Sequence, residues 1–320
     1  MPHVTFVHGL SNKPAADALL RIWKRALAAG AGGLDLDAEG VSSSMVYWAD
    51  VLYASPDQGE DAVAYESTSA EDLARADGSV DVELPAIQMR TVEEAEFLSA
   101  LQRHFTSASL EDIDLGNVPP PEDPSAVALE RVPLPWFIKK RIMKAFLRDA
   151  HHYYFNKPHT PRPGETYRVQ DEIRRRFVAA LTAQADVLPA NGPHVVVSHS
   201  MGTMIAYDCL KRVAACPAID GLITLGSPLG IDEVQDCNTP EWTRADGFPA
   251  DKLTGRWVNV FDRLDVVCAA DPRLAGDFQH GGKDRIEDIG VSNQGYWRHA
   301  VVQYLAQPSL RETLASMLNL

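Results

Sequence analysis

The sequence has few cysteines, no long apolar run and no leader-like N-terminus, and each shortage excludes a class of protein. Four cysteines occur in 320 residues, and none belongs to a C-x-x-C pair. This usage argues against a metal site and is typical of a reduced, cytosolic protein in which cysteine is a small buried hydrophobe, although a single disulfide remains compatible with it. No apolar run is long enough to span a bilayer. Residues 1–4 lack a charged segment followed by an apolar one, so we expect no secretory signal and a cytoplasmic location.

Basic residues are also scarce relative to acidic ones. Lysine and arginine number 30 and aspartate and glutamate 44, which gives a formal net charge of −14 at pH 7. A surface of this charge repels phosphate backbones, so we expect no nucleic-acid partner. The apolar fraction of 45% is ordinary for a globular protein, and a chain of this length can bury a large core.

One stretch, residues 193–208, organises the rest of the chain. The β-branched run 195–197 predicts a buried strand, and apolar residues at helical spacing predict a helix over 203–212. A sharp turn separates the two, with Ser200 at its apex. A serine between a strand and a helix is typical of a nucleophile elbow. A strand that ends in an ordinary polar turn has a similar pattern, so the remaining chain has to supply the partners of the serine.

The turn follows the pattern S-x-S-x-G rather than the usual G-x-S-x-G, because Ser198 replaces the first glycine. The nucleophile in such a turn has a strained backbone, so the residues two before it and two after it must be small. Gly202 meets this requirement, and serine is small enough for position 198. The N-terminus of the following helix favours negative charge that develops beside the serine.

The flanking segments alternate between strand and helix, which predicts an α/β fold with a mostly parallel central sheet and helices on both faces. The expected strands are 4–7, 44–53, 195–197, 219–228 and 256–262. The expected helices are 14–28, 169–185, 203–212, 296–305 and 308–318. We find no internal repeat, and we expect residues 1–320 to form a single domain.

Residues 55–164 interrupt this alternation, and we interpret them as an insertion between sheet strands that could serve as a cap or lid. Helices are expected around 91–105 and 136–155, and between them lies the stiff, proline-rich connector 118–124. The basic, amphipathic segment 136–148 is either a cap helix that touches lipid or an acyl chain or, as we favour, a surface helix that packs on the core.

Three histidines at the end of this insertion suggest a metal site at first sight. They lack nearby carboxylate or cysteine ligands at a recurring spacing. We therefore interpret them as capping and surface residues: His151, His152 and His159.

A nucleophilic serine needs a base, usually a histidine, which is itself oriented by a carboxylate. After the elbow these are expected in the order acid, then histidine. We favour Asp265 as the acid, because it lies in the loop beyond strand 256–262 and can reach over the carboxyl edge of the sheet. Asp262, at the strand end, could instead cap the loop, and Asp271 is a weaker choice.

Two histidines lie beyond these aspartates. His299 stands just before or at the start of the last helical region, where the loop after the final strand delivers the base. His280 is followed by two glycines and is interpreted as part of a surface turn. Taken alone, His299 could be a helix histidine packed beside Trp297, but the preceding elbow and acid favour it as the base.

An oxyanion intermediate needs two preorganised N–H donors. We expect one to be the backbone N–H of Met201, directly after the nucleophile. The second is expected from the loop after the first strand, where Gly9 permits a close backbone approach and Leu10 N–H is the donor. A His8-Gly9 pair that simply terminates a strand is the alternative interpretation.

These features, in this order, resemble the lipase-like and esterase-like serine hydrolases of the α/β-hydrolase superfamily. The resemblance covers residues 3–53 and 166–320 and rests on five motifs: Phe6-Val7-His8-Gly9-Leu10, Ser198-His199-Ser200-Met201-Gly202, Leu225-Gly226-Ser227-Pro228-Leu229, Asp265 and His299. It implies a Ser200–His299–Asp265 triad and an oxyanion hole formed by Met201 and Leu10. It also implies hydrolysis of a small-molecule or lipid-like carboxylic ester through an acyl-enzyme, without a cofactor or metal.

Other activities are compatible with the same motifs. A thioesterase, an amidase or peptidase, or an acyltransferase would use the same triad. A hydrolase-fold binding module that has lost catalysis is disfavoured by the complete set of triad residues. A lipase acting at lipid surfaces would depend on the basic segment 136–148, and the acidic overall charge counts against binding to anionic membranes.

Overall fold

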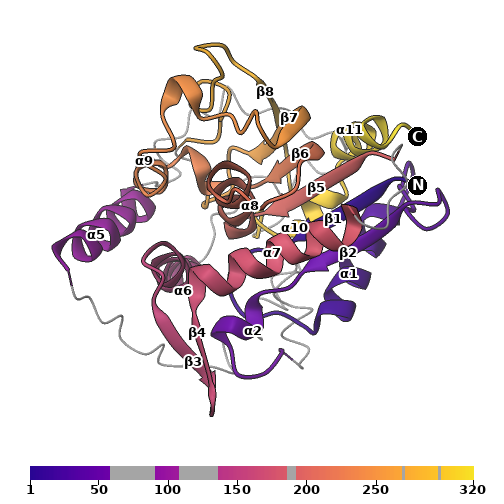
Figure 1. Ribbon diagram of the computed structural model, residues 1–320. Coiled ribbons are helices and arrows are strands. Elements are labelled where there is room, and N and C mark those ends of the chain that lie inside the picture. The colour runs from indigo at the N-terminus through magenta and orange to yellow at the C-terminus, as the bar shows by residue number, and fades with distance from the viewer. Residues whose placement is uncertain (58–90, 108–135, 186–191, 269–270, 295–296) are drawn as a thin grey trace.

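A computed structural model describes residues 1–57, 91–107, 136–185, 192–268, 271–294 and 297–320 (Figure 1). Strands and helices alternate along these segments around one central sheet. Within the insertion, residues 58–90 and the proline-rich connector 118–124 lie outside the described residues. The structure therefore covers all the expected strands and both helices expected in the insertion.

The central sheet has six strands in the order β2-β1-β5-β6-β7-β8, and every neighbouring pair runs parallel. All carboxyl ends therefore meet at one edge, which is where open α/β sheets place their binding sites. β5 is buried along its whole length, as a parallel strand covered on both faces should be. The six strands are β1 (His3–Val7), β2 (Ser42–Val46), β5 (His194–His199), β6 (Ile219–Leu225), β7 (Leu253–Asp262) and β8 (Ile286–Val291).

Helices cover both faces of the sheet and form two apolar cores with it (Figure 1). One core contains α1 (Ala16–Ala28), α10 (Val301–Leu305) and α11 (Pro308–Leu318). The other contains α2 (Ala49–Leu52), α5 (Val92–Ser107), α6 (Trp136–Tyr154), α7 (Val169–Ala185) and α8 (Met201–Arg212). Along β5, Val195 and Val197 face the first core and Val196 faces the second. This arrangement confirms the predicted α/β class with its mostly parallel sheet.

The second strand is shorter than predicted. β2 ends at Val46, and the chain turns into α2 instead of continuing as a strand to residue 53. The indole of Trp48 stacks on the His8 ring at 4.6 Å, and Trp48 N–H donates to His8 Nε2 over 3.0 Å. This contact turns the chain at the end of β2. Val51 and Leu52 are therefore buried in the core as residues of a short helix and not of a strand.

The sequence does not predict three further elements: the edge strand β8, the antiparallel hairpin of β3 (Pro158–Arg162) and β4 (Glu165–Arg168), and the short helix α9 (Asp232–Asp236). In β8 only the two end residues are buried, and the four between them are partly or fully exposed, so its apolar signal is weak. The hairpin forms a sheet of its own beside α2. In addition, the last helical region begins at Val301 rather than at residue 296.

The helix α6 packs on the core, as the favoured interpretation of segment 136–148 expected. Phe146 and Leu147 are buried in the core that also contains α7 and α8. His151 is buried as well, with its Nε2 3.0 Å from Glu94 Oε2 on α5. The prediction of a surface or capping position is therefore wrong for His151, because α5 covers that side of α6. His152 does bond its own helix, since its Nδ1 donates to a backbone carbonyl one turn earlier.

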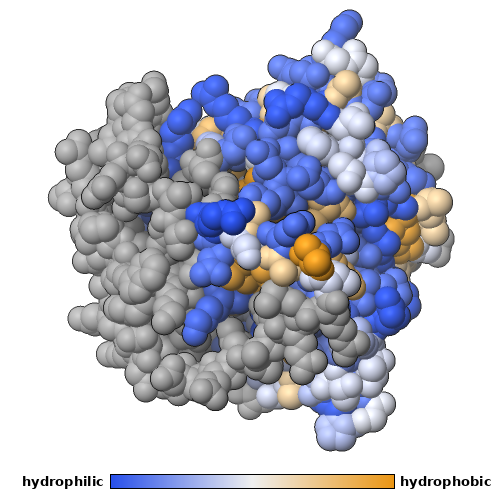
Figure 2. Space-filling model, turned by 90° about the vertical axis from the view of Figure 1, so that its left-hand side faces the viewer, coloured by the Kyte–Doolittle hydropathy of each residue, from blue (hydrophilic) through white to orange (hydrophobic). Residues whose placement is uncertain are grey.

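The described surface exposes few large apolar side chains. Figure 2 shows a face that is mostly hydrophilic where it is described, with scattered apolar residues. Isolated exposures of this kind are ordinary for a globular protein. Among residues with a described side chain, the large apolar ones that are exposed lie at three separate positions: Met1, Val92 and Leu320. In the described ranges, no helix combines the length and the apolar character needed to cross a membrane.

Candidate active site

Ser200 occupies a strained turn between β5 and α8, at the carboxyl edge of the sheet. Its backbone has φ 53° and ψ −129°, a region that L-residues rarely adopt. Ser200 N–H donates to Leu225 O on β6 over 3.0 Å, and Thr203 N–H donates to Ser200 O over 2.9 Å. Strain of this kind persists where surrounding contacts enforce it, and it gathers at functional sites. The structure thus places Ser200 at the apex of a strand, turn and helix.

Two glycines allow the end of β1 to lie against this turn. A Cβ atom on Gly202 would lie 2.5 Å from Val7 O and 2.6 Å from His8 O. A Cβ atom on Gly9 would lie 2.8 Å from the Cβ of Ser200. Contacts this short would overlap, so a residue without a side chain is required at both positions. The loop that follows β1 is therefore in direct contact with Ser200.

Asp265 and His299 form a buried hydrogen bond. His299 Nδ1 lies 2.7 Å from Asp265 Oδ2, and both side chains are almost fully buried. Because the carboxylate is an acceptor, Nδ1 carries the proton and donates it, which leaves the Nε2 lone pair available. The carboxylate also accepts the Tyr304 hydroxyl on Oδ2 (2.7 Å) and Val267 N–H on Oδ1 (2.9 Å). The structure thus brings together the favoured acid and the favoured base.

Asp262 has different partners at the end of β7. Its Oδ1 accepts Leu264 N–H over 2.8 Å. Its Oδ2 accepts Asn293 N–H over 2.7 Å and the Arg298 guanidinium over 3.1 Å. Burial raises the pKa of Asp262 to about 6, against the opposing effect of Arg298. Asp262 therefore caps the loop after β7 and ties it to the segment that carries His299, which is the alternative role that the sequence left open for it.

The two weaker candidates lie at the surface. Asp271 is exposed in the loop between β7 and β8. His280 is also exposed, and its N–H donates to Lys283 O over 3.0 Å across a short turn. The turn contains Gly281 and Gly282, both with positive φ. His280 therefore lies in the surface turn that the two glycines predicted.

His199, the residue before Ser200, packs directly against His299. The ring centroids are 4.6 Å apart, and His199 Nε2 donates to His299 O over 2.8 Å. Burial and then the nearby His299 lower the pKa of His199 well below its ordinary value, so its ring is neutral. Sequence reasoning gave His199 no role, and its position inside the serine turn is the signal that could have revealed it. It fixes the backbone of His299 relative to the turn.

Ser200 Oγ and His299 Nε2 are both buried, and neither has a hydrogen-bond partner among the described residues. They also do not bond to each other in this structure. Buried polar side-chain atoms nearly always have a partner, and these two are among six exceptions in the described residues. Catalytic hydrogen bonds are often long without substrate and tighten when it binds.

The residues expected to supply the oxyanion donors follow residues of the serine site directly: Met201 follows Ser200, and Leu10 follows Gly9. Met201 is the first residue of α8, so its N–H has no partner within the helix. Leu10 is buried and follows Gly9, which touches Ser200. His8 fixes the start of this loop, because its Nδ1 donates to Gly9 O over 2.8 Å. Burial lowers the pKa of His8 to about 3, so the ring is neutral.

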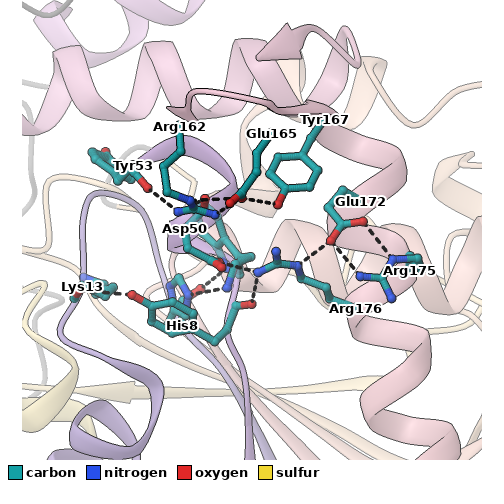
Figure 3. Close-up of polar contacts among 12 residues, drawn as sticks. His8, Lys13, Asp50, Tyr53, Arg162, Glu165, Tyr167, Glu172, Arg175 and Arg176 are labelled. Atoms are coloured by element: carbon teal, nitrogen blue, oxygen red, sulfur yellow. Dashed lines mark hydrogen bonds and ion pairs between the residues drawn. The ribbon is translucent and has the colours of Figure 1, made fainter. Parts of the chain in front are cut away.

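A network of ion pairs fastens α7 to α2 and to the hairpin (Figure 3). Arg176 on α7 bonds Glu172 one turn earlier, over 2.8 Å, and also bonds Asp50 of α2. Arg162 of β3 pairs with Glu165 of β4, and its Nη1 donates to Asp50 O over 3.2 Å. The sequence gives no signal for this network, because it joins residues up to 126 positions apart. It holds α2 in place beside the loop after β1.

A surface groove of about 850 Å³ lies between α7 and the end of α8. None of the candidate catalytic residues lines it. Its arginines are already paired, since Arg174 and Arg212 both bond the buried carboxylate of Asp208 and Arg175 bonds Glu172. We therefore assign no ligand to this groove.

All four cysteines carry free thiols, and three of them are buried, as expected of small hydrophobes: Cys209, Cys216 and Cys268. Burial raises the pKa of these thiols, so they stay protonated and unreactive. Within the described ranges, no three histidine, cysteine, aspartate or glutamate side chains gather closely enough to hold a metal ion.

Comparisons with known proteins leave the function open. No family model matches the chain, and no curated protein is significantly similar to it in sequence. Among solved structures, it is similar to an uncharacterized protein from Pseudomonas aeruginosa, with 10% identity, a TM-score of 0.32 and alignment over 99% of this chain. The chain spans 45% of the length of that protein. A likeness this weak supports no inference about fold or activity.

Proposed function

We propose that the protein is a serine hydrolase with the α/β-hydrolase fold, which cleaves a carboxylic ester of a small or lipid-like substrate. The observation that carries the proposal is the buried Asp265–His299 hydrogen bond, together with a strained serine whose Oγ has no partner among the described residues and whose neighbour His199 packs on His299. The parallel order of the six strands supports the fold assignment, because it brings the serine turn and the acid loop to the same edge.

In the first half of the reaction, Ser200 Oγ attacks the ester carbonyl carbon. His299 Nε2 accepts the hydroxyl proton as the new C–O bond forms, and Asp265 stabilises the imidazolium through Nδ1–H. The tetrahedral intermediate then breaks the bond to the alcohol oxygen. The proton on His299 passes to the leaving alcohol, and the acyl group stays on Ser200.

In the second half, a water molecule attacks the acyl carbon and gives its proton to His299 Nε2. The bond between the acyl carbon and Ser200 Oγ breaks, and the proton returns to the serine. The N–H groups of Met201 and Leu10 bind the oxyanion in both halves, aided by the positive end of α8. Because Ser200 and His299 are at most 1% exposed, these dipoles act in a medium with little water to screen them.

Active-site labelling tests the proposal. The protein is treated with a fluorophosphonate probe, which phosphonylates an activated serine, and the adduct is located by peptide mass mapping. Hydrolysis of p-nitrophenyl acyl esters is measured in parallel. We expect one adduct, on Ser200. Ser200→Ala should remove the adduct and lower kcat by a factor on the order of 10⁶ while the protein stays folded.

Ser198 provides the matched control, because it lies two residues before Ser200 and is equally buried. Its hydroxyl donates to Ile223 O on β6 over 3.2 Å, a partner other than the acid or the base. Ser198→Ala should keep both labelling and hydrolysis. Wild-type protein that is folded but carries no adduct, or Ser200→Ala protein that still turns over ester, would refute the proposed function.

A further inference from the structure

The insertion helix α6 contacts the candidate oxyanion loop through one buried carboxylate. Asp149 is fully buried, and its Oδ2 accepts the backbone N–H of Ser11 over 2.9 Å. The same oxygen accepts the Tyr53 hydroxyl over 3.3 Å, and Oδ1 accepts the Arg148 guanidinium over 2.6 and 2.9 Å. Asp149 therefore joins α6 to the end of α2 and to the loop that follows β1.

Ser11 needs such an external contact to keep its conformation. Its φ is 69°, in the left-handed region that costs an L-residue free energy. It directly follows Leu10, whose N–H is the proposed oxyanion donor, and Gly9, which lies against Ser200. A carboxylate that accepts a backbone N–H forms a strong, charge-assisted hydrogen bond. The bond from Asp149 thus fixes the peptide that links Leu10 to Ser11.

We propose that Asp149 is a positioning residue, which holds the loop of residues 9–11 so that Leu10 N–H points at the oxyanion. This inference rests on the proposed function. If Asp149 has this role, the geometry of the oxyanion hole depends on the position of α6, which belongs to the segment that the sequence marks as an insertion. Loss of the contact lets Ser11 relax to negative φ, which rotates the Leu10–Ser11 peptide. The neighbouring Gly9–Leu10 peptide, which carries the Leu10 N–H, then shifts with it and binds the oxyanion less well.

Other contacts hold α6 in place without touching the loop. Glu94 on α5 pairs with His151 and Lys157, and the Tyr153 hydroxyl donates to Asp208 on α8 over 2.7 Å. Glu94 is 3% exposed, so its substitution perturbs a buried carboxylate much as that of Asp149 does. It therefore provides a matched control that separates a general loss of packing around α6 from a specific effect on the loop.

The test compares Asp149→Ala, Asp149→Asn and Glu94→Gln with the wild type. Two quantities are measured: kcat and KM for a p-nitrophenyl ester, and Kd for a trifluoromethyl ketone, which adds Ser200 Oγ to form a tetrahedral oxyanion. An oxyanion donor acts in the transition state and not on the ground-state ester. We expect Asp149→Ala to lower kcat by about 10- to 100-fold and to weaken the ketone by a similar factor, with KM nearly unchanged.

Asp149→Asn keeps one carbonyl oxygen that can accept Ser11 N–H, so it should retain more activity than the alanine variant. Glu94→Gln should leave kcat and ketone affinity within about twofold of the wild type. Folded Asp149→Ala protein with unchanged kcat, a rise in KM alone, or equal losses in Glu94→Gln would overturn the positioning role. Wild-type protein that the fluorophosphonate does not label would instead overturn the proposed function, and this inference with it.

Discussion

Gly226 offers a direct test of the geometry between the acid and the base. It follows β6, has φ 51°, and its N–H donates to Val260 O over 3.0 Å. A Cβ atom at this position would lie 2.7 Å from Asp265 Oδ2 and 3.1 Å from His299 Nδ1. The first contact is too short to persist. The methyl group of Gly226→Ala should therefore push the carboxylate away from the imidazole, or the imidazole away from the carboxylate.

Two costs add up in this variant. Alanine at a left-handed φ costs about 1–2 kcal/mol whatever surrounds it. The Asp265 carboxylate is held by three donors, so its displacement loses at least one hydrogen bond to a charged group, about 1.5–3 kcal/mol. We expect Gly226→Ala to lower the free energy of unfolding by about 2.5–5 kcal/mol. Because the acid no longer orients the base, kcat for ester hydrolysis should fall by about 10²- to 10⁴-fold.

Gly281 is the matched control for backbone strain. Its φ is 57°, and a Cβ atom there would have no neighbour within 4 Å. Gly281→Ala should therefore lower the free energy of unfolding only by the cost of alanine at positive φ, and it should keep wild-type kcat. Urea unfolding gives the two free energies, and the proton NMR signal of the His299 Nδ1–H reports on its bond to Asp265. The reasoning is refuted if Gly226→Ala keeps wild-type kcat and an unshifted Nδ1–H signal.

Two further predictions concern residues around the site. Tyr304→Phe removes a donor to Asp265 Oδ2 without leaving a cavity, so the free energy of unfolding in urea should fall by about 1.5–3 kcal/mol. We also expect a lower kcat with little change in KM. Unchanged stability would contradict the hydrogen bond. The pKa of His8 is lowered to about 3 by burial, whereas the unfolded ring takes up its proton near 6.5. The unfolded state therefore binds more protons between these values, so the stability that neutral His8 provides is complete above pH 6.5 and is lost as the pH falls towards 3. The slope from this group is at most about 1.4 kcal/mol per pH unit. His8→Asn should flatten the pH dependence of the free energy of unfolding over that window, and an identical dependence in both proteins would exclude the assignment.

The parts of the fold that were predictable carry strong local signals. The β-branched run of β5 and the helical spacing in α7 each predicted an element near its observed bounds. The carboxyl edge of a parallel sheet then limits where a serine and its partners can meet. Weaker elements depend on tertiary contacts. α2 replaces the end of a predicted strand because Trp48 stacks on His8, a residue 40 positions earlier.

Side-chain partners that are far apart in the sequence could not be predicted either, because they also depend on tertiary contacts. His199 and Asp149 stand in segments that the sequence assigned to turn and helix. The position of His199 beside Ser200 is a local signal, whereas nothing local marks Asp149 as a residue that fixes the site. His199 contacts a backbone oxygen 100 residues later, and Asp149 contacts Ser11, 138 residues earlier. The spacing of apolar residues says which face of an element is buried but not which polar group it meets there.

The choice between Asp262 and Asp265 shows how the structure resolves what spacing leaves open. The two aspartates stand three residues apart on one turn, where Asp265 N–H donates to Asp262 O over 3.0 Å. Their partners, Arg298 and His299, are adjacent in the sequence. Arginine stays charged at any physiological pH, so it suits the buried carboxylate that ties the two loops together. Histidine can take and return a proton, so its pairing with Asp265 leaves a reactive nitrogen beside the serine turn. A single turn therefore carries both carboxylates: Asp262 belongs to the structural ion pair with Arg298, and Asp265 belongs to the candidate catalytic pair with His299.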